Sequence, residues 1–347
     1  MPRKIQDLQG GQKSFVQSDP VMSYFTGTKN SSSNVEKRLS SRLRSAIVNG
    51  RQQRIALKEA CKTAAKRASE EDQLRGNFRI DTLISGSSGI GKSHNVKKAL
   101  KESKIPFKEI TGSINEFAFG SDLMVHHYDF IKGRKSPEEK LVILFDDCDS
   151  FFHGPDTRNM LKSILGEERK YQYNKMILEH NLSERQLLIL PHYRNPNGAH
   201  GFTIDTKDII FIITTNIKFP TEREANFESA NKSGGSPRAA KLNDLVAIAG
   251  RCNHRSFFLD PLTNWGFLAS VCLDDDILDT LDEADEGYGL KMELLDWLHY
   301  NWSDMRQHNL RTIIDMAFTM LENPGEYRDI WEAHFLDPEL VNRNTLR

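Results

Sequence analysis

Short apolar runs alternate with amphipathic stretches between residues 78 and 260. Each run has the length of a strand, and the stretches between the runs carry apolar residues at helical spacing. The candidate strands are Arg79–Ser85, Pro106–Ile110, Leu141–Asp146, Ile209–Thr215 and Ser256–Leu259, and the clearest helix is Lys92–Glu102. Such alternation predicts an α/β fold in which helices cover both faces of a parallel sheet.

The two ends of the chain differ from this middle part. Residues 1–34 are rich in Ser, Gly, Gln and Asn, which predicts a flexible arm, and apolar spacing after them predicts one or two helices broken near Asn49-Gly50. After residue 260 the strand pattern ends, and Trp265–Cys272, Tyr288–Asn301 and Leu310–Leu321 predict helices. The expected domains are an arm (1–34), a basic helical segment (35–75), an α/β domain (76–260) and a small helical domain (261–347).

The composition is that of a globular chain with balanced charge. Its 347 residues include 47 Lys and Arg against 48 Asp and Glu, which suits two or three domains that each bury a core. The longest apolar runs are too short to cross a bilayer, and the N-terminus lacks an apolar signal core, so no membrane partner is expected. Four scattered cysteines without a CxxC pair favour a reduced compartment. We therefore expect a cytoplasmic protein.

Two segments are candidates for binding nucleic acid. Between Lys37 and Arg67 there are ten cations and one acid, Glu59, which fits either a solvated helix face or a surface for phosphate groups. In residues 168–205, cations such as Arg169 and Lys170 are mixed with aromatic residues. This second segment fits either a nucleic-acid contact with stacking rings or a hairpin packed on the core.

Residues 86–93, Gly-Ser-Ser-Gly-Ile-Gly-Lys-Ser, match the phosphate-loop pattern G-x-x-x-x-G-K-[ST] and lie between a predicted strand and a predicted helix. The glycines allow the loop to curl with its amides inward, and the helix start adds a positive dipole. Lys92 is expected to reach the terminal phosphates of ATP, and Ser93 to bind Mg²⁺. The candidate nucleotide-binding residues are Gly86, Ser87, Ser88, Gly89, Ile90, Gly91, Lys92, Ser93 and His94.

A second polar cluster follows the apolar strand Leu141–Asp146. A carboxylate at the carboxyl end of a strand can bind the Mg²⁺ beside Ser93, and its neighbour can orient or deprotonate the attacking water. We assign Asp146 to the metal and Asp147 to the water. Asp149 is expected to be structural or to cap the next helix.

The phosphate loop, FDDCD at a strand end, the strand IIFIITTN, then AGRCN and NLRT follow one another in an order that resembles the AAA+ ATPase superfamily, over about residues 76–322. The segments FDDCDSFF and DIIFIITTN are similar to those of AAA+ proteins of bacteriophages. The resemblance implies a P-loop NTPase sheet with an all-α lid domain, hydrolysis of ATP with Mg²⁺, and assembly into a ring or partial ring. The loop and the acidic strand end would be its Walker A and Walker B elements.

The resemblance also implies roles for three further residues. Asn216 matches the polar sensor that places the water, Arg251 matches the arginine presented to a neighbour's γ-phosphate, and Arg311 matches the lid sensor. Arg255 competes with Arg251 for the second role.

Two departures from the family pattern stand out. The acidic pair is Asp-Asp where the family commonly has Asp-Glu, so Asp147 has a shorter reach, and the loop is GSSGIGKS where GPPGTGKT is usual. Two functions therefore stay open: an ATPase that remodels or moves a macromolecule, and an ATP-gated loader that binds a protein or nucleic acid with weak hydrolysis. A P-loop kinase is disfavoured because the sensor and arginine elements would have no purpose.

Overall fold

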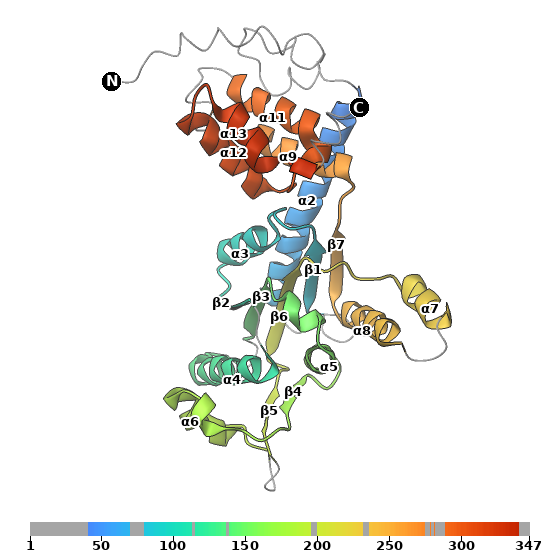
Figure 1. Ribbon diagram of the computed structural model, residues 1–347. Coiled ribbons are helices and arrows are strands. Elements are labelled where there is room, and N and C mark those ends of the chain that lie inside the picture. The colour runs from blue at the N-terminus through green and yellow to red at the C-terminus, as the bar shows by residue number, and fades with distance from the viewer. Residues whose placement is uncertain are drawn as a thin grey trace. The chain divides into compact units, whose positions relative to one another are not determined.

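The computed structural model describes residues 41–69, 80–112, 115–136, 139–195, 200–231, 236–274, 278, 281 and 289–339. The predicted arm, residues 1–34, lies outside them, as do Lys37 and Arg38. The chain divides into two compact units (Figure 1). The larger unit takes the described parts of 57–87 and 92–258, and the smaller unit takes those of 1–56 and 259–347 together with the loop tip, residues 88–91.

A five-stranded parallel sheet forms the centre of the larger unit, in the order β2-β3-β6-β1-β7. Its strands are β1 (Thr82–Gly86), β2 (Phe107–Thr111), β3 (Leu141–Asp146), β6 (Ile209–Thr215) and β7 (Asn253–Phe257). The helices α3 (Lys92–Glu102), α4 (Glu116–Gly133), α5 (Pro155–Ile164), α7 (Glu222–Asn231) and α8 (Pro237–Arg251) connect or flank them. The fold class is therefore the predicted one, a P-loop NTPase-like parallel sheet flanked by helices with a C-terminal helical region.

The central strands are apolar because both faces of the sheet are covered. All residues of β1, β3 and β6 are buried, as expected for a parallel sheet between helices. The edge strand β7 differs, since Arg255 and Ser256 are exposed and only Phe257 is buried. Its polar composition explains why the predicted strand Ser256–Leu259 starts three residues and ends two residues after the observed one.

The described residues between 168 and 205 include a pair of strands that packs on the core. Strands β4 (Lys170–Tyr173) and β5 (Phe202–Asp205) pair antiparallel, and helix α6 (Glu184–Ile189) lies between them in sequence. The Tyr171 ring is fully buried beside Phe119, and its hydroxyl donates to the Glu116 carbonyl at 2.7 Å. Tyr171 and Tyr173 thus serve the core, so these two rings are not exposed for stacking on bases.

The basic segment forms one long helix, α2 (Ser41–Ser69), which continues through Asn49-Gly50. The predicted break is therefore wrong. In the smaller unit α2 crosses α9 (Pro261–Asp274), and a Cβ added to Gly50 would lie 2.2 Å from the carbonyl carbon of Gly266. Gly50 is required for this close crossing of two backbones, a demand that sequence spacing does not reveal.

The smaller unit also contains α11 (Gly289–Asn301), α12 (Leu310–Glu322) and α13 (Tyr327–Phe335). Two cations of α2 are used inside this unit, because Arg51 and Arg54 each donate to Asp274 Oδ2 at 2.7 Å. Part of the positive charge of α2 thus holds helices together.

Single-turn 3₁₀ helices at Asp149–Phe152, Glu179–Asn181, Leu190–His192 and Trp302–Asp304 complete the described elements. None of the helices in the described ranges is both long and apolar enough to span a bilayer.

Candidate nucleotide-binding site

The phosphate-loop sequence links the end of β1 to the start of α3. Gly89 and Gly91 have φ angles of +74° and +84°, the left-handed region that glycine adopts without strain. Ile90 is buried, Ser88 and Gly89 are exposed, and His94 is exposed on the first turn of α3. The positive end of the α3 dipole therefore lies at the loop, where an anionic group is stabilised.

The side chain of Lys92 is buried and fully engaged. Its Nζ donates to the carbonyl oxygens of Gly86 (2.9 Å) and Ser87 (2.8 Å) and to Oδ1 of Asn216 (2.8 Å). Burial lowers the pKa of Lys92 to about 8, against the opposing effect of the nearby aspartates. The loop thus holds a poorly solvated cation, which an entering phosphate can pair with more favourably than water can.

Ser93 and Asp146 meet at the carboxyl end of the sheet. The Ser93 hydroxyl donates to Asp146 Oδ1, and Thr214 Oγ1 donates to the same oxygen at 2.9 Å. Thr214 reaches both residues because β6 lies between β1 and β3, in register with Asp146. Burial acts to raise the pKa of Asp146, but hydrogen bonds from Ser93, Lys97 and Thr214 outweigh it and lower the pKa.

This arrangement fits a magnesium ion beside bound phosphates. A hydroxyl and an ionised carboxylate are hard oxygen ligands of the type that Mg²⁺ prefers, with water and phosphate oxygens completing its shell. Thr214 and Lys97 were missed in the sequence. The signal for Thr214 was its place near the end of the run IIFIITTN, two residues before Asn216.

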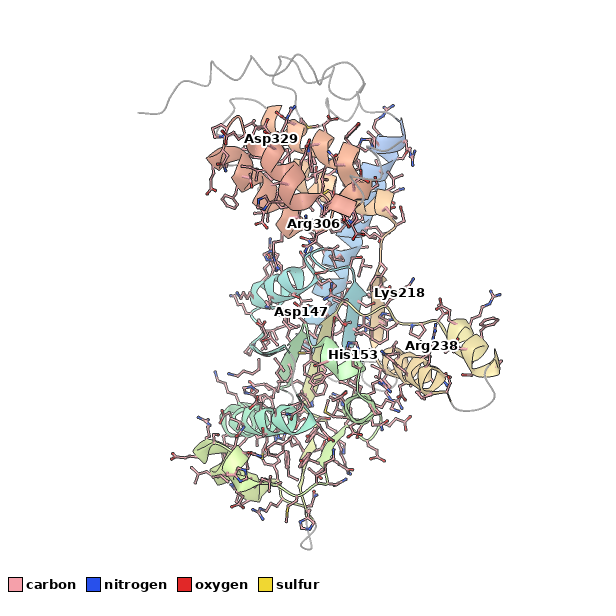
Figure 2. All side chains as sticks on the ribbon, in the orientation of Figure 1. Asp147, His153, Lys218, Arg238, Arg306 and Asp329 are labelled. Atoms are coloured by element: carbon pink, nitrogen blue, oxygen red, sulfur yellow. The ribbon has the colours of Figure 1, made fainter. Side chains whose placement is uncertain are left out.

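Asp147 and Asn216 form the outer part of the cluster. Asp147 is exposed beyond the end of β3, with a φ of +53°, and is labelled in Figure 2. Asn216 Nδ2 lies 3.3 Å from Asp147 Oδ1. The one amide side chain of Asn216 therefore contacts both the loop lysine and the proposed water-activating carboxylate.

Asp149 fixes the position of Asn216. Its Oδ1 accepts hydrogen bonds from the Thr215 hydroxyl and from the backbone N–H of Asn216, the latter at 3.2 Å. Asp149 was expected either to be structural or to cap the next helix, and these contacts are those of a structural residue. The side chain ties the strand end after β3 to the strand end of β6.

Arg251 lies outside this cluster, and Arg311 belongs to the other unit. Arg251 is the last residue of α8, is half-buried, and donates from Nη1 to the Ala247 carbonyl of its own helix at 2.9 Å. Arg311 is exposed in the first turn of α12 and belongs to the smaller unit. Within that unit the Leu310 N–H donates to the Gly89 carbonyl at 3.3 Å, so the start of α12 contacts the loop tip. The structure thus brings together Lys92, Ser93, Asp146, Asp147 and Asn216, but not Arg251.

The sheet order, the phosphate loop and the acidic strand end define the class as a P-loop NTPase-like fold. No protein-family model matches the sequence. An uncharacterized 36.7 kDa protein in the nrdC-mobD intergenic region of Enterobacteria phage T4 is 28% identical over 265 residues, covering 73% of this chain and 67% of the relative.

One solved structure similar to this chain is a closed-state cryo-EM reconstruction of Hsp104 with ATPγS and FITC casein. It is 14% identical with a TM-score of 0.38, covering 74% of this chain and 42% of the Hsp104 chain. The present chain thus spans less than half of that protein. The fold assignment rests on the strand order and the loop described above.

Proposed function

We propose that this chain is a Mg²⁺-dependent ATPase of the AAA+ type that hydrolyses ATP to ADP and phosphate and uses the nucleotide state to remodel or move a macromolecule. The observation that carries the proposal is the joined network of Lys92, Asn216 and Asp147 beside the Ser93–Asp146 pair. These side chains come from the loop and from two strand ends. Together they supply a phosphate cation, a metal carboxylate and a water-positioning pair.

Ser93 and Asp146 would hold Mg²⁺, which when bound neutralises charge on the β- and γ-phosphates. Lys92 would exchange its bonds to the Gly86 and Ser87 carbonyls for bonds to phosphate oxygens. Asp147 would accept the proton of the attacking water, while the Asn216 amide orients that water. Because Asn216 already contacts both Lys92 and Asp147, it would link phosphate binding to the placement of the nucleophile.

The arginines would complete the site in an assembly. Arg251 stands at the C-terminal end of α8, and within the described residues it donates to the Ala247 carbonyl of its own helix, so its guanidinium could turn toward a neighbouring subunit. A planar guanidinium there would stabilise charge on the γ-phosphate in the transition state. Arg311, in the helix whose start contacts the loop tip, would report the nucleotide from the lid. A homo-oligomeric ring or partial ring follows from a trans role for Arg251.

The macromolecule proposed as substrate is nucleic acid, bound through 37–67 and through the exposed cations of 168–205, such as Lys175 and Arg185, rather than through its buried tyrosine rings. Arg42 and Arg44 on α2 are exposed and add positive charge near the end of that helix. The cytoplasm, or the host cytoplasm for a viral chain, is the proposed compartment. The similarity to a T4 protein supports the viral reading.

A second function, an ATP-gated loader with weak hydrolysis, is favoured by the nature of Asp147. This carboxylate is shorter than the glutamate common in the family, and its backbone is in the left-handed region. The distance from its carboxylate to an attacking water therefore depends on the backbone as much as on the side chain, which favours weak hydrolysis. Such a protein would bind its partner with ATP and release it slowly.

Steady-state ATP hydrolysis measured without nucleic acid and with single-stranded DNA, duplex DNA or RNA tests the proposal. We expect Mg²⁺-dependent turnover that Lys92→Ala abolishes and Asp147→Asn reduces at least about a hundredfold, with Lys98→Ala as a surface control on the same helix. Strong stimulation by one nucleic acid supports the motor, and ATP-dependent binding with little turnover supports the loader. Full hydrolysis by Lys92→Ala would contradict both.

A further inference from the structure

Helix α3 contacts both oxygens of the carboxylate that the proposed function assigns to the metal. Ser93 and Lys97 are four residues apart, so they lie on the same face of α3. The Ser93 hydroxyl donates to Asp146 Oδ1, and Lys97 Nζ lies 2.9 Å from Asp146 Oδ2. The carboxylate is therefore held between a hydroxyl and an ammonium from a single helix.

A second carboxylate fixes Lys97 in this position. Lys97 Nζ donates to Glu109 Oε1 at 2.6 Å, and Glu109 lies on β2, the strand next to β3. The side chains of Lys97 and Glu109 are about one-third exposed, whereas that of Asp146 is 10% exposed. Lys97 thus bridges an outer acid and a buried acid.

The charges at this strand end suggest why a bridging lysine is needed. Asp146, Asp147 and Asp149 follow one another within four residues, and Lys92 and Lys97 are cations that interact with them. A group of carboxylates attracts free divalent cations even without nucleotide. With Lys97 in place, Oδ2 of Asp146 is paired with an ammonium and Oδ1 with the hydroxyls of Ser93 and Thr214.

We propose that Lys97 is a positioning residue that acts as an internal counter-cation: it prevents Asp146 from taking up a divalent cation before nucleotide binds, so that the metal enters with the triphosphate. This inference rests on the proposed function. The ammonium repels a lone dication at close range, whereas a metal–ATP complex brings its own negative charge and phosphate ligands. The metal and the nucleotide would then enter the site together, and no metal bound beforehand would block the metal–ATP complex.

The test uses the full chain and Mn²⁺, whose free ion gives an electron paramagnetic resonance signal that disappears on binding. Titrations without nucleotide compare wild type with Lys97→Gln, which removes the charge, and Lys97→Arg, which keeps it. Lys98→Gln is the matched control, because Lys98 is the next residue of α3, is 62% exposed, and forms a loose pair with Glu102 at 4.0 Å. We expect Lys97→Gln to bind Mn²⁺ alone about tenfold more tightly than wild type, and the other two variants to match wild type.

Lys97→Gln that binds Mn²⁺ no more tightly than wild type overturns the inference, provided that its thermal melt shows a folded protein. A second measurement does not depend on that variant: wild type should bind Mn²⁺ tightly only when a non-hydrolysable ATP analogue is present. Wild type that binds Mn²⁺ equally well without the analogue also overturns the role of Lys97. If wild type binds Mn²⁺ together with the analogue, but Lys97→Gln binds Mn²⁺ alone no more tightly than wild type does, only the role of Lys97 is wrong. If wild type binds no analogue at all, the proposed function fails.

Discussion

The Nζ atom of Lys92 lies 2.8 Å from the Oδ1 atom of Asn216, across 124 positions of sequence. The contact joins the phosphate loop after β1 to the end of the adjacent strand β6. Asp149 holds Asn216 from the other side through the backbone N–H. Any movement of Lys92 toward a phosphate must therefore change the environment of Asn216.

Replacing Asn216 by Ala should slow hydrolysis more than it weakens binding. We expect turnover to fall on the order of a hundredfold, as when one preorganised polar group is removed from a transition state, while ATP affinity changes little because Lys92 and the loop stay in place. Single-turnover hydrolysis and equilibrium binding on the same samples measure the two effects. Asn243→Ala, an exposed asparagine on α8, is the control, and unchanged turnover in Asn216→Ala would remove Asn216 from the mechanism.

Arg251 should act on the site of a neighbouring subunit. Arg251→Ala and Lys92→Ala are each expected to be inactive, the first with a loss of about a thousandfold. An equal mixture should regain about a quarter of wild-type turnover, because one interface in four then combines an intact Lys92 with an intact Arg251 from its neighbour. Arg255→Ala tested in the same way identifies the competing arginine. A mixture without activity, or a monomer under all conditions, counts against a trans arginine.

Breaking the buried pair of Asp81 and Arg169 should destabilise the larger unit. Asp81 is 2% exposed, accepts from the Phe211 N–H at 2.8 Å, and pairs with Arg169, which also donates to the Ile209 carbonyl. Arg169→Met leaves the Asp81 charge unpaired and should lower the free energy of unfolding by about 3–5 kcal/mol. Adding Asp81→Asn should recover part of this loss, because Asn accepts from Phe211 without a charge.

Urea or thermal unfolding measures both Arg169 variants. Arg185 provides the comparison, since it forms an exposed pair with Asp129 in which both side chains are more than one-third exposed. Arg185→Met should change stability by less than about 1 kcal/mol. An equal loss of stability in Arg169→Met and Arg185→Met would show that the buried pair contributes no more to the free energy of unfolding than the exposed pair does.

Mild acid should destabilise the protein through His127. Burial lowers the pKa of His127 below its ordinary value, with Asp208 and Asp205 opposing in part, and Nδ1 lies 2.9 Å from the Tyr193 hydroxyl oxygen. Because the unfolded chain binds a proton more readily than the folded chain does, stability is full above pH about 6.5 and is lost as the pH falls toward the folded pKa. His127→Gln, which keeps a hydrogen-bonding side chain but does not titrate, should melt with a shallower pH dependence between pH 7.5 and 5.5. Parallel curves for the two proteins would exclude His127 as the titrating group.

The sequence predicted the parts of the fold that depend on local pattern. The bounds of β3, β6 and α3 agree with the predicted Leu141–Asp146, Ile209–Thr215 and Lys92–Glu102, because an uninterrupted apolar run or a helical period marks each of them. The edge strand β7 was displaced because only one of its residues is buried. The break in α2 was wrong because Gly50 serves a helix crossing.

In the candidate site, too, the sequence predicted the residues that a local pattern marks and missed those that only tertiary contacts define. A phosphate loop has its own local signature, so the sequence could single out Lys92 and Ser93. The contacts of Thr214, Lys97 and Asp149 depend instead on the order of the strands, which places β6 between β1 and β3 and sets α3 against Asp146. No spacing along the chain reports these neighbours, and polar residues of these types are common on exposed surfaces.

Calorimetric titration of the full chain with ATP and Mg²⁺ tests the central claim most directly, with wild type, Lys92→Ala and the surface control Lys98→Ala compared at pH 7. If the triphosphate binds on the loop, wild type and Lys98→Ala should bind with the same affinity, and Lys92→Ala should bind at least about a hundredfold more weakly because a buried ammonium has been removed from the phosphate. Equal affinities in all three proteins would place the nucleotide elsewhere and contradict the account.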